Sequence, residues 1–297
     1  MIYERPGDID FSAADCAAVP LPGRVLLTSP THFDVEYVIN PHMAGHLGDV
    51  DGQLAGRQWR TLRSAYETFG FTVSVVEGTE GLADMVFCAN QTLPFYRPDD
   101  GSKGVVMSRM HAPQRTGEVP HFERYFRQIG YEVLHLPESD VHAFEGMGDA
   151  LWHPHRYLLW GGYGIRTDRA AYDAVSQALD VPVVAMQLHD EAFYHLDTCF
   201  CALDERTVLI YPGAFQNHAL RMIHALFDRV VEAPESEARR LLACNAHSPD
   251  GRHVLVQEGC TETAGRLREA GFEPVEIDTS EFLKAGGSVY CMKQMFW

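Results

Sequence analysis

The sequence predicts an α/β fold assembled from repeated units, and two observations support this prediction. First, three segments share a pattern in which an amphipathic helix ends at a glycine and is followed by an aromatic residue and a short strand: "YETFGFTVSVVEG", "FRQIGYEVLHLPE" and "LREAGFEPVEIDT". Second, apolar runs bounded by turns lie between these segments. Because each unit mixes strands with one helix, an α/β repeat fits better than an all-helical one.

The helix-to-strand joins set the period of the repeat. Glycine suits the position after a helix because it adopts a left-handed conformation at low cost. A looser fourth copy, "VSQALDVPVVAMQLHDE", has Asp180 at this position. Phe71 and Tyr131 are 60 residues apart and Tyr131 and Val181 are 50 apart, which divides 297 residues into about five units. Such a period indicates an array closed on itself or a solenoid, and a single open α/β sheet is the alternative.

Five apolar runs are the predicted strands between the helices: "GRVLLTSP", "DMVFCANQTLPF", "YLLWGGYGI", "TCFCALDERTVLIYP" and "GSVYCMKQMF". The stretch "RPDDGSKG" reads as a hairpin turn. No Gly/Ser linker or low-complexity tract divides the chain. We therefore expect residues 1–297 to form a single catalytic domain.

Composition and charge narrow the class of protein. The chain is 46% hydrophobic and 22% charged, which is typical of a globular protein, and its net charge of -17 argues against nucleic acid as a partner. No run approaches 18 apolar residues and the N-terminus lacks a secretory signal, so we expect no membrane association. The seven cysteines are expected to be free thiols in the cytoplasm.

Several polar residues interrupt apolar runs, where an unpaired charge is costly. His195 and Asp197 stand at strand spacing in "FYHLDTCFCAL" and are predicted to point to the same face. Three other segments contribute candidates: Asn90 in "VFCANQTLPF", Glu145 and Asp149 in "AFEGMGDALW", and Cys291 in "GGSVYC".

Each candidate has a simpler structural explanation when it is taken alone. An isolated Cys291 is more often an inert core thiol, an isolated His195 more often structural, and Glu145 could be a turn acid. Cys199 and Cys201 beside His195 lack a second ligand pair of zinc type, so no metal site is expected. Phosphate-loop, dinucleotide and G-x-S-x-G motifs are absent from the sequence.

Taken together, the candidate residues predict a more specific chemistry than each does alone. A nucleophilic cysteine needs a base and a positive neighbour, whereas Glu145, Asp149 and Asp197 would make this site negative. A cationic substrate would resolve the conflict. A guanidinium pairs with carboxylates and carries an electrophilic carbon, so the set fits covalent attack on a guanidinium carbon.

At this point the motifs resemble those of the guanidino-group modifying superfamily, which includes arginine deiminases, dimethylargininases, amidinotransferases and bacterial arginine dihydrolases. The resemblance runs nearly end to end and is greatest to the amidinotransferase and dihydrolase-type members. It rests on "SPTHFDVEYVINPHM", "VFCANQTLPF", "RTGEVPHFERYF", "FEGMGDAL", "GGYGIRTD", "FYHLDTCFCAL", "YPGAF" and "EFLKAGGSVYC".

The resemblance implies a five-bladed α/β propeller of pentein type, with ββαβ-type repeats and the site at its centre. It implies Cys291 as the nucleophile, His195 as the general acid and base, and Glu145 as the carboxylate that orients His195 and the guanidinium. Substrate-binding roles are implied for the following residues: Asp197 for guanidinium nitrogens, Arg109 and Arg166 for the substrate carboxylate, and Asn40 and Asn90 as in the dihydrolase pattern. Asp149 is expected to support the site through hydrogen bonds.

Two positions bear on the subfamily. Deiminases generally carry an aspartate where this chain has Asn90, which indicates a dihydrolase, an enzyme that converts arginine to ornithine, ammonia and carbon dioxide. Met147 departs from the pattern because a small residue is more usual between the two glycines. The expected substrate is arginine, methylarginine or another small guanidino compound, with no cofactor, and a homo-oligomer is compatible with the resemblance.

Alternatives stay open within and outside the superfamily. A dimethylargininase or an amidinotransferase would use the same fold, and a non-catalytic propeller scaffold is the remote alternative. The stretch 234–249 departs most from the expected pattern and is predicted to line the entrance. Cys291 is expected on the last strand of the last repeat, with the following "MFW" packed rather than frayed, and Gly286 and Gly287 are expected to allow close approach of backbone and substrate.

Overall fold

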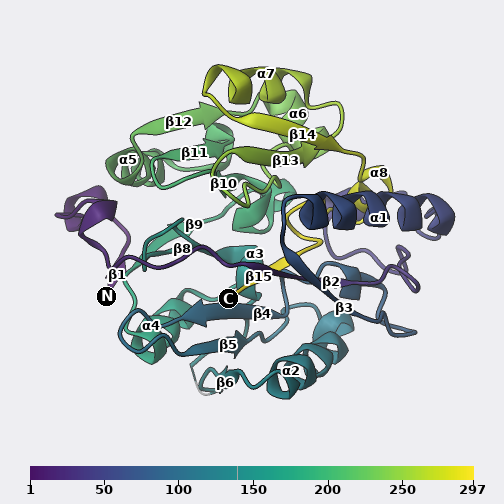
Figure 1. Ribbon diagram of the computed structural model, residues 1–297, viewed down its shortest axis with the longest axis horizontal. Coiled ribbons are helices and arrows are strands. Elements are labelled where there is room, and N and C mark those ends of the chain that lie inside the picture. The colour runs from purple at the N-terminus through teal and green to yellow at the C-terminus, as the bar shows by residue number, and fades with distance from the viewer. Residues whose placement is uncertain (139) are drawn as a thin grey trace.

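A computed structural model of the chain has five β-sheets arranged around its centre, with helices on their outer side (Figure 1). The structure describes residues 1–138 and 140–297. The α/β class predicted from the sequence is therefore confirmed. Within the described residues the sheets contain four, three, two, three and three strands.

Three of the sheets share one order of elements, a hairpin followed by a helix and a third strand. The two hairpin strands are antiparallel, and the third strand returns parallel to the second. The elements are β4 Thr92–Tyr96, β5 Lys103–Met107, α2 Val119–Gln128 and β6 Glu132–His135; β7 Ala150–Trp152, β8 Leu159–Tyr163, α4 Arg169–Leu179 and β9 Val183–Gln187; and β10 Phe200–Ala202, β11 Thr207–Ile210, α5 Asn217–Leu226 and β12 Arg229–Glu232.

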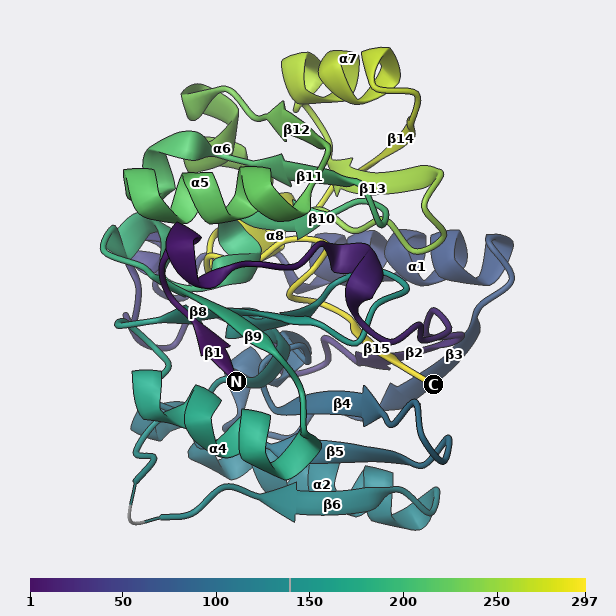
Figure 2. The ribbon, with the colours of Figure 1, turned by 90° about the vertical axis from the view of Figure 1, so that its left-hand side faces the viewer.

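A fourth sheet joins the two ends of the chain. Strand β15 (Gln294–Phe296) pairs antiparallel with β2 (Arg24–Thr28), which pairs parallel with β3 (Thr72–Val76) after helix α1 (Gly52–Thr68). The C-terminal residues are buried, so the prediction of a packed terminus is confirmed. At the other end, β1 (Ile2–Tyr3) adds to β9, and Figure 2 shows β1, β8 and β9 between α4 and α5.

The fifth sheet has two parallel strands, β13 (His253–Gln257) and β14 (Glu273–Ile277). Helix α7 (Thr261–Glu269) connects them in the sequence. A single antiparallel bridge between His247 and Leu255 stands where the other units have their first strand. The described residues also form three short α-helices: α3 Gly146–Asp149, α6 Glu235–Leu241 and α8 Ser280–Leu283.

The predicted helix-to-strand joins are confirmed. Gly70, Gly130 and Gly271 have φ angles of 85°, 82° and 94°, and Asp180 takes the same left-handed region with φ of 50°. The repeat that sequence reading missed is α5 with β12. Helix α5 ends at Leu226, and the next residue, Phe227, has an extended backbone, so no glycine marks the end of this helix.

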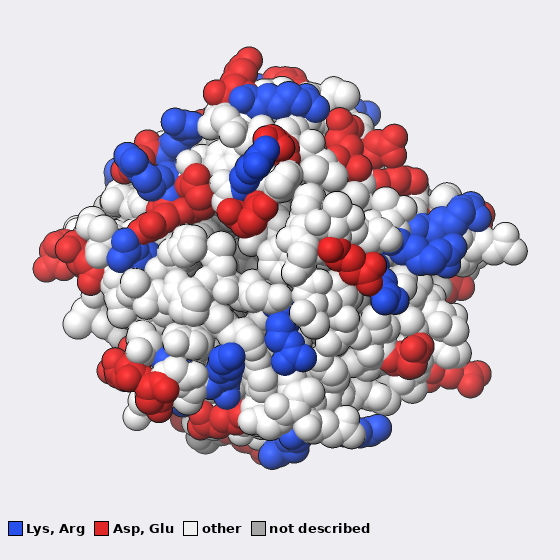
Figure 3. Space-filling view, in the orientation of Figure 1, with Lys and Arg blue, Asp and Glu red and all other residues white. Residues whose placement is uncertain are grey.

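The last predicted strand is shorter than expected. Cys291 lies in a turn that precedes β15, so the prediction that Cys291 stands on a strand is wrong. The described part of the chain contains no helix with the length and apolar character needed to cross a bilayer. Charged side chains gather towards the rim of the face shown in Figure 3, and the centre of that face is largely uncharged.

Candidate active site

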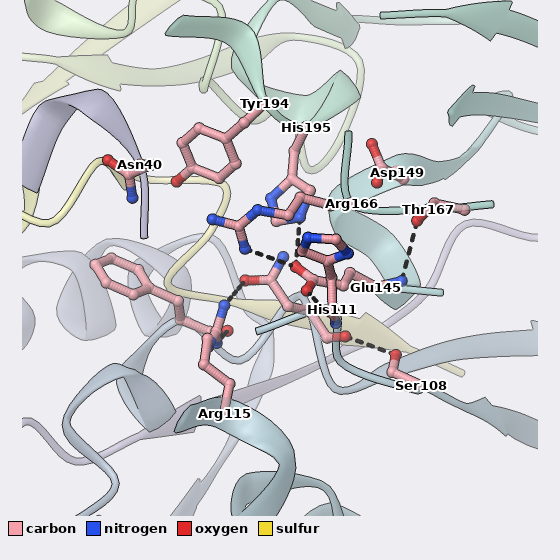
Figure 4. Close-up of polar contacts among 12 residues, drawn as sticks. Asn40, Ser108, His111, Arg115, Glu145, Asp149, Arg166, Thr167, Tyr194 and His195 are labelled. Carbon is pink, nitrogen blue, oxygen red and sulfur yellow. Dashed lines mark hydrogen bonds and ion pairs between the residues drawn. The ribbon is translucent and has the colours of Figure 1, made fainter. Parts of the chain in front are cut away.

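Glu145 and His195 form a buried pair (Figure 4). His195 Nε2 lies 2.7 Å from Glu145 Oε2, and both side chains are almost fully buried. His195 precedes a 3-10 turn, Leu196–Thr198, so it shares a turn with Asp197 rather than the strand that the sequence predicted. Because Nε2 faces the carboxylate, the opposite nitrogen, Nδ1, is left for a ligand.

Glu145 is held in its charged form. Its Oε1 accepts from the backbone N–H of His111 at 2.9 Å, and its Oε2 accepts from Arg166 at 3.3 Å. Burial alone would raise the pKa of Glu145, but the hydrogen bond and charge of His195, with the guanidinium of Arg166, hold that pKa well below its usual range. A charged Glu145 can orient His195 and stabilise its protonated form.

Cys291 is also buried, in the turn before β15. Its Sγ donates to Asp197 Oδ2 at 3.1 Å and accepts from Asn245 Nδ2 at 3.2 Å. Burial, and then the Asp197 carboxylate, raise the pKa of the Cys291 thiol well above its ordinary value. Without a cation beside it, Cys291 is therefore a thiol and not a thiolate.

Asn245 fixes the turn that carries Cys291. Its Oδ1 accepts from the backbone N–H groups of Ser288 and Cys291, at 3.0 and 3.2 Å. Its Nδ2 donates to Asp197 O at 3.1 Å as well as to the sulfur. Asn245 is not among the predicted site residues, and its segment was expected to line an entrance, whereas Asn245 is buried in contact with Cys291.

Asp197 and Asp149 each present one unpartnered oxygen. Among the described residues, Asp197 Oδ1 and Asp149 Oδ2 have no hydrogen-bond partner, whereas Asp149 Oδ1 accepts from Leu196 N at 3.0 Å. Burial raises the pKa of Asp197 to about 7 and that of Asp149 to about 6. Both carboxylates would gain from a cationic donor that supplies the missing hydrogen bonds.

Asn90 is oriented by a residue that sequence reading did not assign. Buried Arg115 donates to Asn90 Oδ1 at 2.9 Å, and because a guanidinium only donates, this contact fixes which end of the amide is oxygen. Asn90 Nδ2 is left unpartnered. A Cβ added to Gly148 would lie 2.4 Å from Asn90 Nδ2 and 3.1 Å from His195 Nδ1, so both nitrogens face the space over this glycine.

An open cleft of about 750 Å³ leads toward these residues, and Asn40, His111, Arg166 and Tyr194 are among its lining. Arg166 lies 4.9 Å above the ring of Tyr194 and donates to Ile39 O at 2.7 Å. Tyr194 also packs against His195, with ring centroids 4.7 Å apart. His111 and Tyr194 were not among the predicted site residues.

Two predicted residues have other partners in the structure. Arg109 donates to the carbonyl groups of Leu136 and Val141 and pairs with Glu138 at 3.6 Å, and in the described part of the chain its side chain forms no hydrogen bond or ion pair with another predicted site residue. Asn40 uses Oδ1 to cap the turn Pro41–Met43 and Nδ2 to bind Ala285 O at 3.0 Å. Their roles in substrate binding stay predictions.

Three further expectations from the sequence can be placed. Met147 lines a different cavity and is absent from the lining of the cleft, so its departure from the family pattern does not alter the cleft. Gly286 and Gly287 are close-packed, but against the side chains of Asn40 and Phe87. All seven cysteines are free thiols.

Comparison with known proteins agrees with this geometry. The family model described as N,N dimethylarginine dimethylhydrolase, eukaryotic, matches residues 42–296. The N(G),N(G)-dimethylarginine dimethylaminohydrolase of Mycobacterium tuberculosis is 38% identical over 272 residues, covering 92% of this chain and 85% of that protein. The fold and the buried cysteine, histidine and carboxylates define an enzyme of the guanidino-modifying pentein superfamily. Within it, the chain belongs to the dimethylarginine dimethylhydrolase family.

A second group of relatives is larger than this chain. The bifunctional arginine dihydrolase/ornithine cyclodeaminase ArgZ of Synechocystis is 37% identical over 91% of this chain, which spans only 37% of that protein's length. The solved N-terminal domain of ArgZ bound to substrate superimposes with a TM-score of 0.84 and 36% identity, covering 92% of this chain and 97% of that domain.

Proposed function

We propose that the protein is a cysteine-dependent hydrolase that acts on the guanidino group of free arginine or an arginine derivative, of the arginine dihydrolase or deiminase type. One observation carries the proposal. Cys291 and the His195–Glu145 pair stand beside four buried polar atoms that lack partners: Asp197 Oδ1, Asp149 Oδ2, Asn90 Nδ2 and His195 Nδ1. Buried polar atoms without partners are rare, and a polar ligand would satisfy them.

The carboxylates account for substrate choice and for activation of the nucleophile. A guanidinium would supply the donors that Asp197 and Asp149 lack, and its positive charge would lower the pKa of the Cys291 thiol. The thiol proton would pass to a neighbouring base or to solvent as the thiolate forms. The resting thiol would thus become a nucleophile only when a cationic substrate is bound.

The hydrolysis then proceeds through a covalent intermediate. The thiolate attacks the guanidinium carbon, and protonated His195 gives its proton to the departing amine, leaving a thiouronium on Cys291. His195 next takes a proton from water, which adds to the same carbon. Collapse expels the thiolate and releases a ureido product, with Glu145 stabilising the charged form of His195.

The free donor of Asn90 supports a reaction in which an oxygen atom, from water, adds to the guanidino carbon. Asn90 Nδ2 is a donor and therefore has no match on a guanidinium, which only donates. A water molecule, a developing oxyanion or the carbonyl group of a ureido product would accept its hydrogen bond. This geometry supports the dihydrolase type, in which the ureido compound is hydrolysed a second time.

The family membership and the relative from Mycobacterium tuberculosis support a second candidate, the dimethylarginine dimethylaminohydrolase reaction. The test is mass spectrometry of products from arginine with ¹⁵N-labelled guanidino nitrogens and, separately, from dimethylarginine. Ornithine with two labelled ammonia molecules indicates a dihydrolase, and citrulline with one indicates a deiminase. Dimethylamine release without arginine turnover selects the second candidate, and turnover that requires an added amine acceptor would indicate an amidinotransferase.

We also infer the larger architecture. The five sheets around one centre support a closed five-bladed propeller that forms one catalytic domain over residues 1–297. The seven free thiols support a reducing, cytoplasmic location. A homo-oligomer is part of the proposal, and sedimentation at several protein concentrations would test it.

A further inference from the structure

A second cavity, here named the Lys293 cavity, shares no lining residue with the substrate cleft. It has a volume of about 80 Å³. Its wall combines proline, methionine and tryptophan side chains, among them Pro20, Trp152 and Trp297, with five polar side chains: His153, His155, His247, Ser248 and Lys293. The C-terminus lies near the middle of the face shown in Figure 1, where Figure 3 shows largely uncharged surface.

Lys293 is unusual among the lysines of this protein. All three lysines lie in the described part of the chain; Lys103 is exposed, Lys284 pairs with Glu281, and Lys293 is fully buried. Its Nζ has no hydrogen-bond partner among the described residues. An ammonium has three donors, and burying it without acceptors is costly.

Although the Asp197 carboxylate attracts the charge of Lys293 from farther away, no carboxylate of the described residues forms a hydrogen bond or an ion pair with this lysine. Its Nζ lies 3.1 Å from the centroid of the Tyr290 ring, a contact that compensates for only part of the lost hydration. No aspartate or glutamate lines the cavity, although the chain carries 41 acidic residues. Burial lowers the pKa of Lys293 to about 7.

Two further polar side chains, Ser248 and His247, line the same cavity. Ser248 Oγ is buried without a hydrogen bond. His247 Nδ1 lies 2.9 Å from the Tyr66 hydroxyl, so Nε2 is the ring nitrogen left for a ligand. Donors without acceptors, together with an apolar wall, match a ligand that has one anionic end and one apolar end.

We propose that the Lys293 cavity is a second ligand site, separate from the substrate cleft, that binds a small aliphatic carboxylate. The carboxylate group would accept hydrogen bonds from Lys293 and Ser248, and the aliphatic part would pack against Trp152, Trp297 and the prolines. A volume of 80 Å³ holds roughly five to eight water-sized spheres, which limits the ligand to a compact molecule. Butyrate is a suitable probe because it has this size and charge.

The experiment compares three probes of equal chain length on the full-length protein: butyrate, 1-butanol and butylammonium. Binding is followed by calorimetry and by tryptophan fluorescence, since Trp152 and Trp297 line the cavity. We expect saturable butyrate binding, with 1-butanol at least about tenfold weaker and no binding of butylammonium. Lys293→Met, which keeps the side-chain length, should weaken butyrate at least about tenfold, and Lys103→Met should leave it unchanged.

Equal affinity for butyrate and 1-butanol, or unchanged butyrate affinity in a folded Lys293→Met protein, would overturn the proposal. If Lys293→Met does not fold, the comparison of the three probes on the natural protein decides alone. The site does not depend on the proposed reaction, so Cys291→Ser should bind butyrate as before. Displacement of butyrate by arginine in Cys291→Ser would assign the binding to the cleft and contradict a separate site.

Discussion

Asp197 is predicted to serve the proposed reaction and to lower the stability of the folded protein at the same time. The carboxyl group is fully buried, has one unpartnered oxygen and has a pKa raised to about 7. In the unfolded chain the same group titrates near 4, so as the pH falls from 8 the folded protein takes up the proton first. Stability of the folded state against unfolding therefore increases as the pH falls through 7, as far as this group is concerned.

Replacing Asp197 with asparagine should separate the two roles. At about pH 8 we expect Asp197→Asn to raise the unfolding free energy by on the order of 2 kcal/mol and to abolish turnover, because the charge is removed. At about pH 5.5 the gain should nearly vanish because the natural residue is then protonated. Denaturant unfolding at both pH values measures the difference. Asp99→Asn on the exposed surface is the control, and an equal gain at both pH values would contradict the account.

We predict that Asn245 positions Cys291 for its proposed role as nucleophile. Asn245→Ala leaves the N–H groups of Ser288 and Cys291 without their acceptor and removes the donor to sulfur. We expect a loss of roughly 1–3 kcal/mol in stability and a fall in kcat that exceeds any change in KM. Asn217→Ala, at an exposed helix position, is the matched control.

A purely structural role for Asn245 can be distinguished by alkylation of Cys291. The hydrogen bond from Asn245 lowers the pKa of the thiol, so its loss should shift the alkylation profile to higher pH. Asn245→Asp keeps the acceptor for the two backbone N–H groups but removes the donor to sulfur, so the thiol pKa should stay raised in this variant as well. An unchanged alkylation profile in both variants would limit Asn245 to a structural role.

At the scale of elements, short turns before strands decide the geometry of the site. Helix α3 brings Gly148 against Asn90 and His195, where a Cβ would lie 2.4 Å from Asn90 Nδ2. Arg115 holds Asn90 in place, so the amide cannot turn away freely. We expect Gly148→Ala to reduce kcat/KM by at least about a hundredfold, because displacement of reacting groups is costly in rate.

Gly265→Ala is the matched control for Gly148→Ala. Gly265 lies in helix α7, and a Cβ added there meets nothing within 4 Å. The change should stabilise the protein by up to about 1 kcal/mol through helix propensity and leave turnover unchanged. Full activity of Gly148→Ala in steady-state assays would show that the space over this glycine is not where the reaction occurs.

Strand β15 joins the C-terminus to the nucleophile. Phe296 is fully buried against Phe126 and Tyr131, and Gln294 pairs with Leu26 of β2. We expect Phe296→Ala to cost about 3–5 kcal/mol of stability and to lower kcat as well, since Cys291 lies in the turn before this strand. Phe296→Leu should cause a smaller loss of stability and a smaller fall in kcat. Loss of stability with unchanged kcat would show that β15 does not position Cys291.

The sequence allowed the elements to be predicted where a local signal exists. Gly70, Gly130 and Gly271 mark helix ends because their left-handed φ angles leave few other choices of residue. The repeat of α5 and β12 was missed because its exit through Phe227 is extended and carries no such mark. Cys291 was placed on a strand because the apolar run around it extends beyond the three residues that pair.

At the scale of the whole molecule, each repeat contributes to one centre from an equivalent position. Asn90, Glu145, His195, Asn245 and Cys291 each stand two to five residues before the first strand, or the bridge, of their unit. Comparison of the repeats could therefore have indicated Asn245. Arg115 and Tyr194 could not have been found this way, because their roles depend on tertiary contacts to Asn90 and Arg166.

The central claim is that Cys291 forms a covalent bond to the guanidino carbon of the substrate. The most direct test is rapid acid quenching of the protein during turnover of ¹³C-guanidino-labelled arginine, or of dimethylarginine, followed by mass spectrometry of its peptides. We predict a labelled adduct on the peptide that contains Cys291, which forms and decays at rates compatible with kcat and is absent from Cys291→Ser. Full turnover by Cys291→Ser, or an adduct confined to another cysteine, would contradict it.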